Sequence, residues 1–110
     1  MRTVEITKEA FASMVKDFRV PAKYYEALDA DNAYYTEDDE AVASFKAGDY
    51  SVTFFEGYTP EVEANGYAHD VKSVNALRAF LKAIIELGQP EELTEEQDEN
   101  LYSLYNKCFR

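Results

Sequence analysis

The stretch EVEANGYAHDV, residues 61–71, decides the fold class of this sequence. Its centre, Asn65-Gly66, is the strongest short signal for a two-residue β-hairpin turn, because both residue types tolerate the positive φ angles of a type I′ turn. The runs on either side alternate in part between apolar and polar residues, as strands with one buried face do. The stretch therefore predicts two antiparallel strands joined by a tight turn.

The segment AVASFKAGDYSVTFFEG, residues 41–57, allows two interpretations. Thr36 as an N-cap, acidic residues in the first turn and a final glycine would make a helix. Gly48-Asp49 between two strand-forming runs would instead make a second hairpin. We favour the hairpin, because with the first one it forms an antiparallel meander of about four strands. Its second strand would place on one face Tyr50, Val52 and Phe54.

Before this sheet, the sequence predicts a short strand and two helices. RTVEIT, residues 2–7, has strand character, and Thr7 can cap a helix over residues 8–18. Pro21 separates that helix from a second one over residues 22–28. The apolar face of the first helix would carry Phe11, Met14, Val15 and Phe18.

After the sheet, two further helices are expected. Residues 73–88 have an apolar stripe with a helical period, and Thr94 with Gln97 forms a capping box that opens a last helix. The order of helices, sheet and helices predicts a single α+β domain over residues 1–110. The two stripes comprise Val74, Leu77, Leu81, Ile84 and Ile85, and then Leu101, Leu104, Tyr105 and Cys108.

Composition restricts the partners of this domain. There are 22 acidic and 11 basic residues, and the net charge of −11 opposes direct binding to nucleic acid or an anionic membrane. No apolar run approaches the roughly 20 residues that span a bilayer. The opening MRTVEITKEAF lacks the apolar core of a signal peptide, so we expect a cytoplasmic protein of the producing or host cell.

The acidic residues gather in two tracts, residues 26–40 and 86–99, each with seven acids and no base. Like charges repel by about 0.2–0.5 kcal/mol for each close helical pair, so folding alone gives little reason to collect them. Glu95 and Glu96 have a structural explanation, because they offset the dipole of the last helix. In the first tract Tyr34-Tyr35 could help carboxylates hold Arg or Lys through cation–π contacts. A merely solvated surface is the alternative.

The stretch DADNAYYTEDDE, residues 29–40, can be compared with the calcium loop of an EF-hand. Ala33 at the fifth position has no side-chain oxygen, and Tyr34 stands at the sixth, where the turn requires Gly. These two residues argue against calcium. The residues that do fit positions one, three, nine and twelve are Asp29, Asp31, Glu37 and Glu40.

No motif indicates catalysis or a cofactor. The chain has one histidine, His69, in a predicted strand, and one cysteine, Cys108, on an apolar helix face, where a cysteine usually acts as a small hydrophobe. It has no G-x-S-x-G, P-loop or dinucleotide pattern, and too few Cys and His ligands for zinc. We therefore expect a protein that is not an enzyme and has no cofactor.

Two resemblances point toward inhibitors. In its acidity the chain resembles the small proteins with which phages and plasmids block CRISPR or restriction enzymes, often as nucleic-acid mimics. Carboxylates three or four residues apart on a helix stand about 5–6 Å apart, a spacing comparable to that of phosphates. Locally, VPAKYYEALDA, residues 20–30, resembles the barstar family of ribonuclease inhibitors, which implies an inhibitory role for Asp29. Beyond residue 30 the likeness ends, because the hairpins do not suit the parallel sheet of that family.

We therefore expect a non-enzymatic acidic binding or inhibitor protein that blocks a basic surface, above all on a nucleic-acid-acting enzyme, in the manner of anti-CRISPR or antirestriction proteins. A calcium-binding module and a subunit of a larger assembly are the alternatives; the assembly would expose an apolar patch over Phe54, Phe55 and Tyr58, and a homodimer is compatible with the sequence. The predicted partner-binding residues are Asp29, Asp31, Tyr34, Tyr35, Glu37, Asp38, Asp39, Glu40, Glu95, Glu96 and Glu99.

Overall fold

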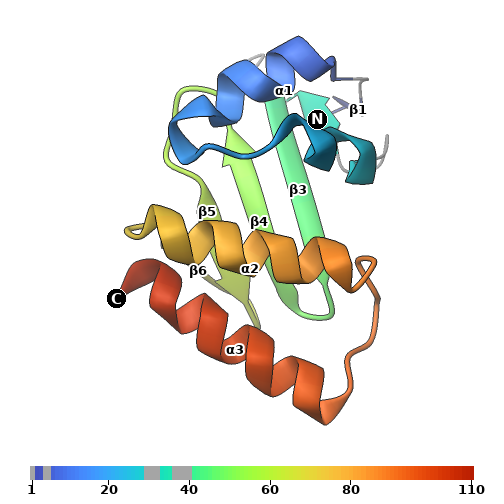
Figure 1. Cartoon of the computed structure of the whole chain (residues 1–110), viewed down its shortest axis with the longest axis vertical. Helices are drawn as coiled ribbons and strands as arrows, with labels where there is room; N and C mark the ends of the chain where they lie inside the picture. The colour runs from blue at the N-terminus through green and yellow to red at the C-terminus, as the bar shows by residue number, and fades with distance from the viewer. Residues whose placement is uncertain (1, 4–5, 29–32, 36–40) are drawn as a thin grey trace.

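One antiparallel sheet runs through the molecule, and the helices lie against one of its faces (Figure 1). The computed structural model describes residues 2–3, 6–28, 33–35 and 41–110, and within them the strand order is β1-β2-β3-β4-β5-β6. The strands are β1 (Arg2–Thr3), β2 (Ala33–Tyr35), β3 (Ala41–Ala47), β4 (Tyr50–Phe55), β5 (Glu61–Ala64) and β6 (Tyr67–Asp70). The helices are α1 (Lys8–Val15), α2 (Val74–Glu86) and α3 (Glu95–Phe109), with 3-10 helices η1 (Lys16–Phe18) and η2 (Ala22–Ala27). The predicted α+β class is confirmed.

The four-strand meander forms through the two predicted hairpins. Ala47 pairs with Tyr50 across Gly48-Asp49, so the hairpin interpretation of residues 41–57 is correct and the helical one is wrong. In the second hairpin Asn65 and Gly66 have φ angles of 52° and 85°, as a type I′ turn requires. Because each sheet neighbour is also the neighbour in sequence, local turn chemistry suffices to set this topology.

Two short strands extend the meander: β1, which lies within the short strand predicted at residues 2–7, and β2, which the sequence did not predict. β2 pairs with β3 on one side and with β1 on the other, both antiparallel. A three-residue strand carries too little alternation to be recognised in the sequence. All pairings are antiparallel, so the barstar likeness of residues 20–30 does not extend to the sheet.

The core lies between the sheet and the helices. Alternate residues of β4 face it, and the predicted trio of Tyr50, Val52 and Phe54 is buried. Phe45 of β3 lies at its centre, with its ring centroid 6.3 Å from those of Phe11 and Phe54 in edge-to-face geometry. The helical residues that complete the core are Phe11, Val15, Leu77, Phe80, Leu81, Ile84, Leu101, Tyr105 and Cys108.

The helix predictions differ from the structure in the burial of Val74, in the end of the first helix and in the type of the second. Val74 is exposed, because it is the first residue of α2 and precedes the part of the helix that crosses the sheet, whereas Phe80 is fully buried. The first helix ends earlier than predicted: α1 stops at Val15 and continues as η1, after which Arg19 takes a left-handed φ of 51°. Residues 22–27 form a 3-10 helix instead of the expected α-helix, and Leu28 is already extended.

Side-chain caps fix where the helices begin, as the sequence predicts. Thr7 Oγ1 accepts from Ala10 N at 3.1 Å at the start of α1. At α3 both halves of the capping box are present, with Gln97 N donating to Thr94 Oγ1 at 3.2 Å and Thr94 N donating to Gln97 Oε1 at 3.0 Å. Within the described ranges, no helix combines the length and apolar character needed to cross a bilayer.

Candidate binding surface

The first acidic tract falls largely outside the described residues. Six of its predicted binding residues, Asp29, Asp31, Glu37, Asp38, Asp39 and Glu40, lie there. The backbone of Tyr34 and Tyr35 belongs to β2, where Tyr34 pairs with Val42 and Tyr35 with Ala41. The tyrosine pair therefore lies in a strand between β1 and β3, and its proposed binding role stays a prediction.

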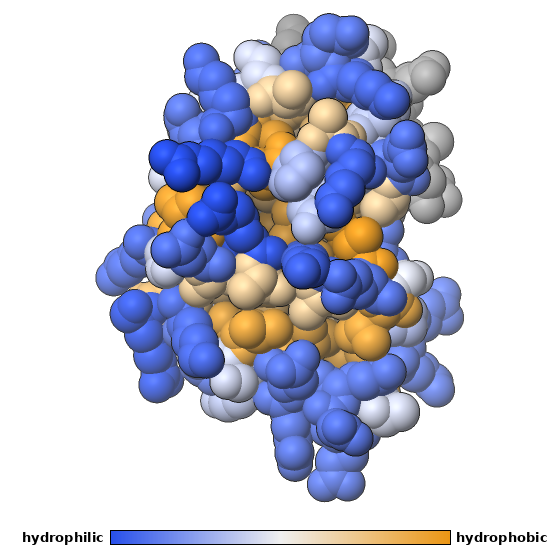
Figure 2. Space-filling view, in the orientation of Figure 1, coloured by the Kyte–Doolittle hydropathy of each residue, from blue (hydrophilic) through white to orange (hydrophobic). Residues whose placement is uncertain are grey.

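The second acidic tract is described in full and runs along the start of α3. Glu95, Glu96 and Glu99 are exposed, as a binding role requires. Glu95 and Glu96 occupy the first turn, where carboxylates compensate the positive end of the helix dipole. Figure 2 shows hydrophilic residues along the lower edge of the molecule, where Figure 1 places α3, and an apolar band above it.

The structure adds Asp49 to this tract. The β3–β4 turn touches the loop before α3, because Gly48 N donates to the Pro90 carbonyl at 2.8 Å. The turn and the loop enclose a hollow of about 490 Å³, which we call the acidic hollow. The carboxylates that line it are Asp49, Glu91, Glu92, Glu95 and Asp98.

Sequence reasoning missed Asp49 because it is 42 or more positions away from the residues it joins. Locally it is an ordinary turn residue beside a glycine. Its role on the surface depends on the contact between Gly48 and Pro90, which no sequence periodicity encodes. Only the position of Gly48-Asp49 between two strands could have directed attention to this turn.

Gln89 connects the start of the second tract with the start of the first. Its side-chain amide donates to the Ala27 carbonyl at 2.7 Å, and its Oε1 accepts from Lys46 N at 3.2 Å. Gln89 has a φ of 52°. Its two side-chain bonds hold Ala27 and Lys46 together beside the loop that leads to the acidic hollow.

The charge of the hollow is not neutralised by ion pairs. Within the described part of the chain, the ion pairs are Lys8 with Glu26 and Lys82 with Glu86, both with exposed partners 3.9 Å apart. Neither includes a carboxylate of the hollow. Five uncompensated carboxylates at one end of the molecule generate a negative potential that attracts cationic groups.

The negative charge of the hollow also affects the buried Tyr50. The Tyr50 ring is 2% exposed, and its hydroxyl donates to the main-chain carbonyl of Asp98 at 3.3 Å. Burial, and then the negative charge of Asp98, raises the pKa of Tyr50 to about 12. Tyr50 is therefore a neutral hydrogen-bond donor that fixes α3 against β4 at the edge of the hollow.

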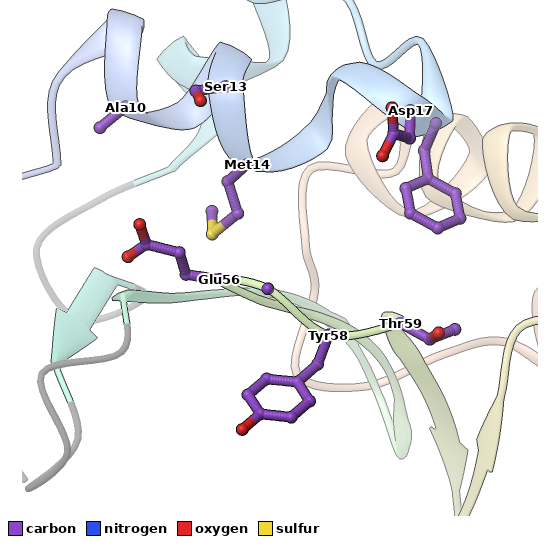
Figure 3. A pocket seen from close by; sticks show the side chains of 9 residues that line it. Ala10, Ser13, Met14, Asp17, Glu56, Tyr58 and Thr59 are labelled. Atoms are coloured by element: carbon purple, nitrogen blue, oxygen red, sulfur yellow. The ribbon is translucent and has the colours of Figure 1, made fainter.

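A larger cavity of about 620 Å³ lies between α1 and the turn after β4. Its polar lining consists of Ser13, Asp17, Glu56 and Thr59. Met14 extends from α1 into the gap, whereas the Tyr58 ring points away from α1 (Figure 3). These side chains do not converge on one point, so we base no function on this cavity.

The single cysteine is structural. Cys108 is fully buried and its thiol donates to the Leu104 carbonyl at 3.3 Å. Burial raises the pKa of this thiol to about 12, which keeps it protonated and unreactive. His69 stacks on Phe109, with ring centroids 3.8 Å apart.

Neither alternative function gains from the structure. Residues 29–40 are preceded by the 3-10 helix η2 and followed by strand β3, whereas an EF-hand has a helix on each side of its loop. Among the described residues, no group of three or more metal-ligating side chains forms a cation site. The apolar patch expected of an assembly subunit does not include Phe54, because that ring is buried in the core.

Comparison with known proteins gives no relative: no protein-family model, no curated protein and no solved structure matches this chain.

Proposed function

We propose that this chain is a non-enzymatic acidic binding protein that blocks a basic surface of its partner. The observation that supports this best is the acidic hollow, where carboxylates from the β3–β4 turn and from the loop before α3 come together. The helix dipole accounts for acids in the first turn of α3, but not for Glu91 and Glu92, which precede the N-cap, or for Asp49, which comes from another hairpin. Repulsion between these like charges lowers the stability of the fold, and binding to a cationic surface would offset that repulsion.

The partner we propose is an enzyme that acts on nucleic acid. Such enzymes carry basic channels for phosphates, and a rigid array of carboxylates can occupy a channel of that kind. We propose that the chain acts as an inhibitor of the anti-CRISPR or antirestriction type. We propose the first tract as a second contact, separate from the hollow, because Tyr35 pairs with Ala41 at the end of β3 opposite the Gly48-Asp49 turn.

Charge reversal with a matched control tests this function. Glu91→Lys with Glu92→Lys lowers the negative charge of the hollow from −5 to −1, and Asp38→Lys with Asp39→Lys lowers that of the first tract from −7 to −3. Glu9→Lys with Glu56→Lys makes the same change in net charge at exposed positions outside both tracts. We expect the first two variants to lose binding and the third to keep most of it.

The assay needs a defined partner. Capture from the natural host followed by mass spectrometry supplies the candidate, and inhibition of its isolated nucleic-acid binding or cleavage supplies the measurement. Inhibition should weaken steeply between low and high salt, because exposed charges are screened within about 10 Å at 0.1 M salt. Equal loss in all three variants, or inhibition that ignores salt, would refute the proposal.

A further inference from the structure

Two exposed tyrosines, Tyr67 and Tyr102, lie outside both acidic tracts. Tyr67 of β6 is 72% exposed and Tyr102 of α3 is 53% exposed. Large exposed tyrosines need a reason, because each ring could bury apolar area elsewhere, and tyrosine is enriched in protein interfaces. Their neighbours suggest the reason.

The buried Tyr105 contacts both residues, through the main chain of Tyr67 and through the ring of Tyr102. The Tyr105 hydroxyl donates to the main-chain carbonyl of Tyr67 at 3.0 Å, and the Tyr105 and Tyr102 ring centroids are 6.4 Å apart. Tyr105 in turn meets Tyr50 edge-to-face at 6.1 Å, so the two exposed residues rest on a packed aromatic core. An aromatic surface supported in this way loses little conformational entropy on binding.

Two carboxylates lie beside Tyr102, because it comes one helical turn after Asp98 and Glu99, at the i+4 and i+3 positions, where side chains are about 5–6 Å apart. Glu63 is on the other face of the sheet, since Val62 and Ala64 are the residues of β5 that are buried against the helices. Within the described residues, no ion pair neutralises these acids, and no cation lies over either exposed ring.

We propose that Tyr67 and Tyr102, with Asp98 and Glu99, form an anchor for arginine side chains of the basic partner; this rests on the proposed function and specifies its centre. A guanidinium group stacks on a tyrosine ring through its flat face and donates to carboxylates through its edge. A ring with acids one turn away offers both contacts at once. The ammonium group of lysine lacks this planar face and binds as a point charge.

The occupant is a partner segment and not a second copy of this chain. The chain carries a net charge of −11, and the anchor itself is acidic, so two copies repel at this face. An arginine-bearing segment is complementary to it in charge and in shape. The neighbouring acidic hollow extends the same negative surface toward Asp49.

The test uses a blocked peptide of alternating Gly and Arg, and the same peptide with Lys, titrated at low salt into the ¹⁵N-labelled chain. We expect backbone amide shifts to centre on residues 63–67 and 98–106, with weaker binding of the Lys peptide. Each of Tyr67→Ala and Tyr102→Ala should weaken the Arg peptide about two- to five-fold, the range of one exposed cation–π contact. Tyr102→Phe should retain affinity because it keeps the ring.

Tyr58→Ala is the matched control, because Tyr58 is 64% exposed but lies in the turn after β4. Unchanged circular dichroism shows that each variant folds. Equal affinity of wild type, Tyr67→Ala and Tyr102→Ala for the Arg peptide would overturn the anchor. If Glu91→Lys with Glu92→Lys still lowered that affinity, the acidic binding function would stand without the anchor. Equal binding of the Lys peptide, no binding to the wild type, or a wild-type dimer that Tyr102→Ala dissociates would each also overturn the anchor.

Discussion

Replacing Gly48 by alanine tests the contact that builds the acidic hollow. Gly48 has a φ of +57°, and a Cβ added to it would lie 2.8 Å from Leu93 Cδ1 and 2.9 Å from Leu93 Cγ. The left-handed backbone alone costs an alanine about 1–2 kcal/mol, partly offset by a gain of about 0.4–1 kcal/mol from the stiffer unfolded chain. Displacing Leu93 adds the cost of overpacking, typically about 1–3 kcal/mol. We expect Gly48→Ala to destabilise the fold by about 2 kcal/mol or more.

Gly66→Ala provides the matched control. Gly66 also lies in a two-residue hairpin turn with positive φ, but a Cβ there would meet nothing within 4 Å. Its cost should therefore stay near the backbone contribution of about 1 kcal/mol. The difference between the two variants isolates the contact with Leu93.

Urea unfolding measures these costs, followed by circular dichroism or tyrosine fluorescence, since the chain has nine tyrosines and no tryptophan. A double-mutant cycle with Leu93→Ala completes the design, because that change removes both atoms that the new Cβ would strike. The cost of Gly48→Ala should fall by about 1 kcal/mol when Leu93→Ala is already present. An equal cost with and without the Leu93 side chain would refute the steric argument and the placement of the turn against the loop.

Four further perturbations have outcomes that the structure fixes. Native Cys108 should resist thiol reagents at pH 8 and react fully after unfolding, because it is buried with a raised pKa; rapid native labelling would contradict this. Tyr50 titrates near pH 10 when unfolded but near 12 when folded, so its contribution to stability is complete below pH 10 and is lost as pH rises toward 12. Tyr50→Phe should flatten the fall in urea midpoint between about pH 10 and 12, and an unchanged fall would contradict the assignment to Tyr50. Thr94→Ala should cost about 1 kcal/mol in urea unfolding by removing the α3 cap, and a cost near zero would show that the cap is dispensable. Phe45→Ala should cost about 3–5 kcal/mol by leaving a cavity between the rings of Phe11 and Phe54, and a loss below about 1 kcal/mol would contradict the central position of Phe45.

The elements that the sequence predicted well are those whose signals are local. Asn65-Gly66 forms its turn because two adjacent residues accept positive φ, and Thr94 with Gln97 begins α3 because the two side chains reach each other's backbone within one turn. Val74 was wrongly expected to be buried for the same reason. A helical stripe is a local pattern and does not show which turn of the helix extends beyond the sheet. β2 was missed because a strand of three residues depends on its neighbours for recognition.

By itself, the sequence determined the α+β class, the two hairpins and the excess of acidic residues, because turn chemistry, apolar periodicity and net charge are properties of neighbouring residues or of composition. Tertiary structure alone decided which acids meet. Asp49 joins Glu91 and Glu92 through the bond from Gly48 to Pro90, and Tyr67 meets α3 through the hydroxyl of Tyr105. These contacts join segments about 40 residues apart, and they form only when α3 and the loop before it pack against the hairpins.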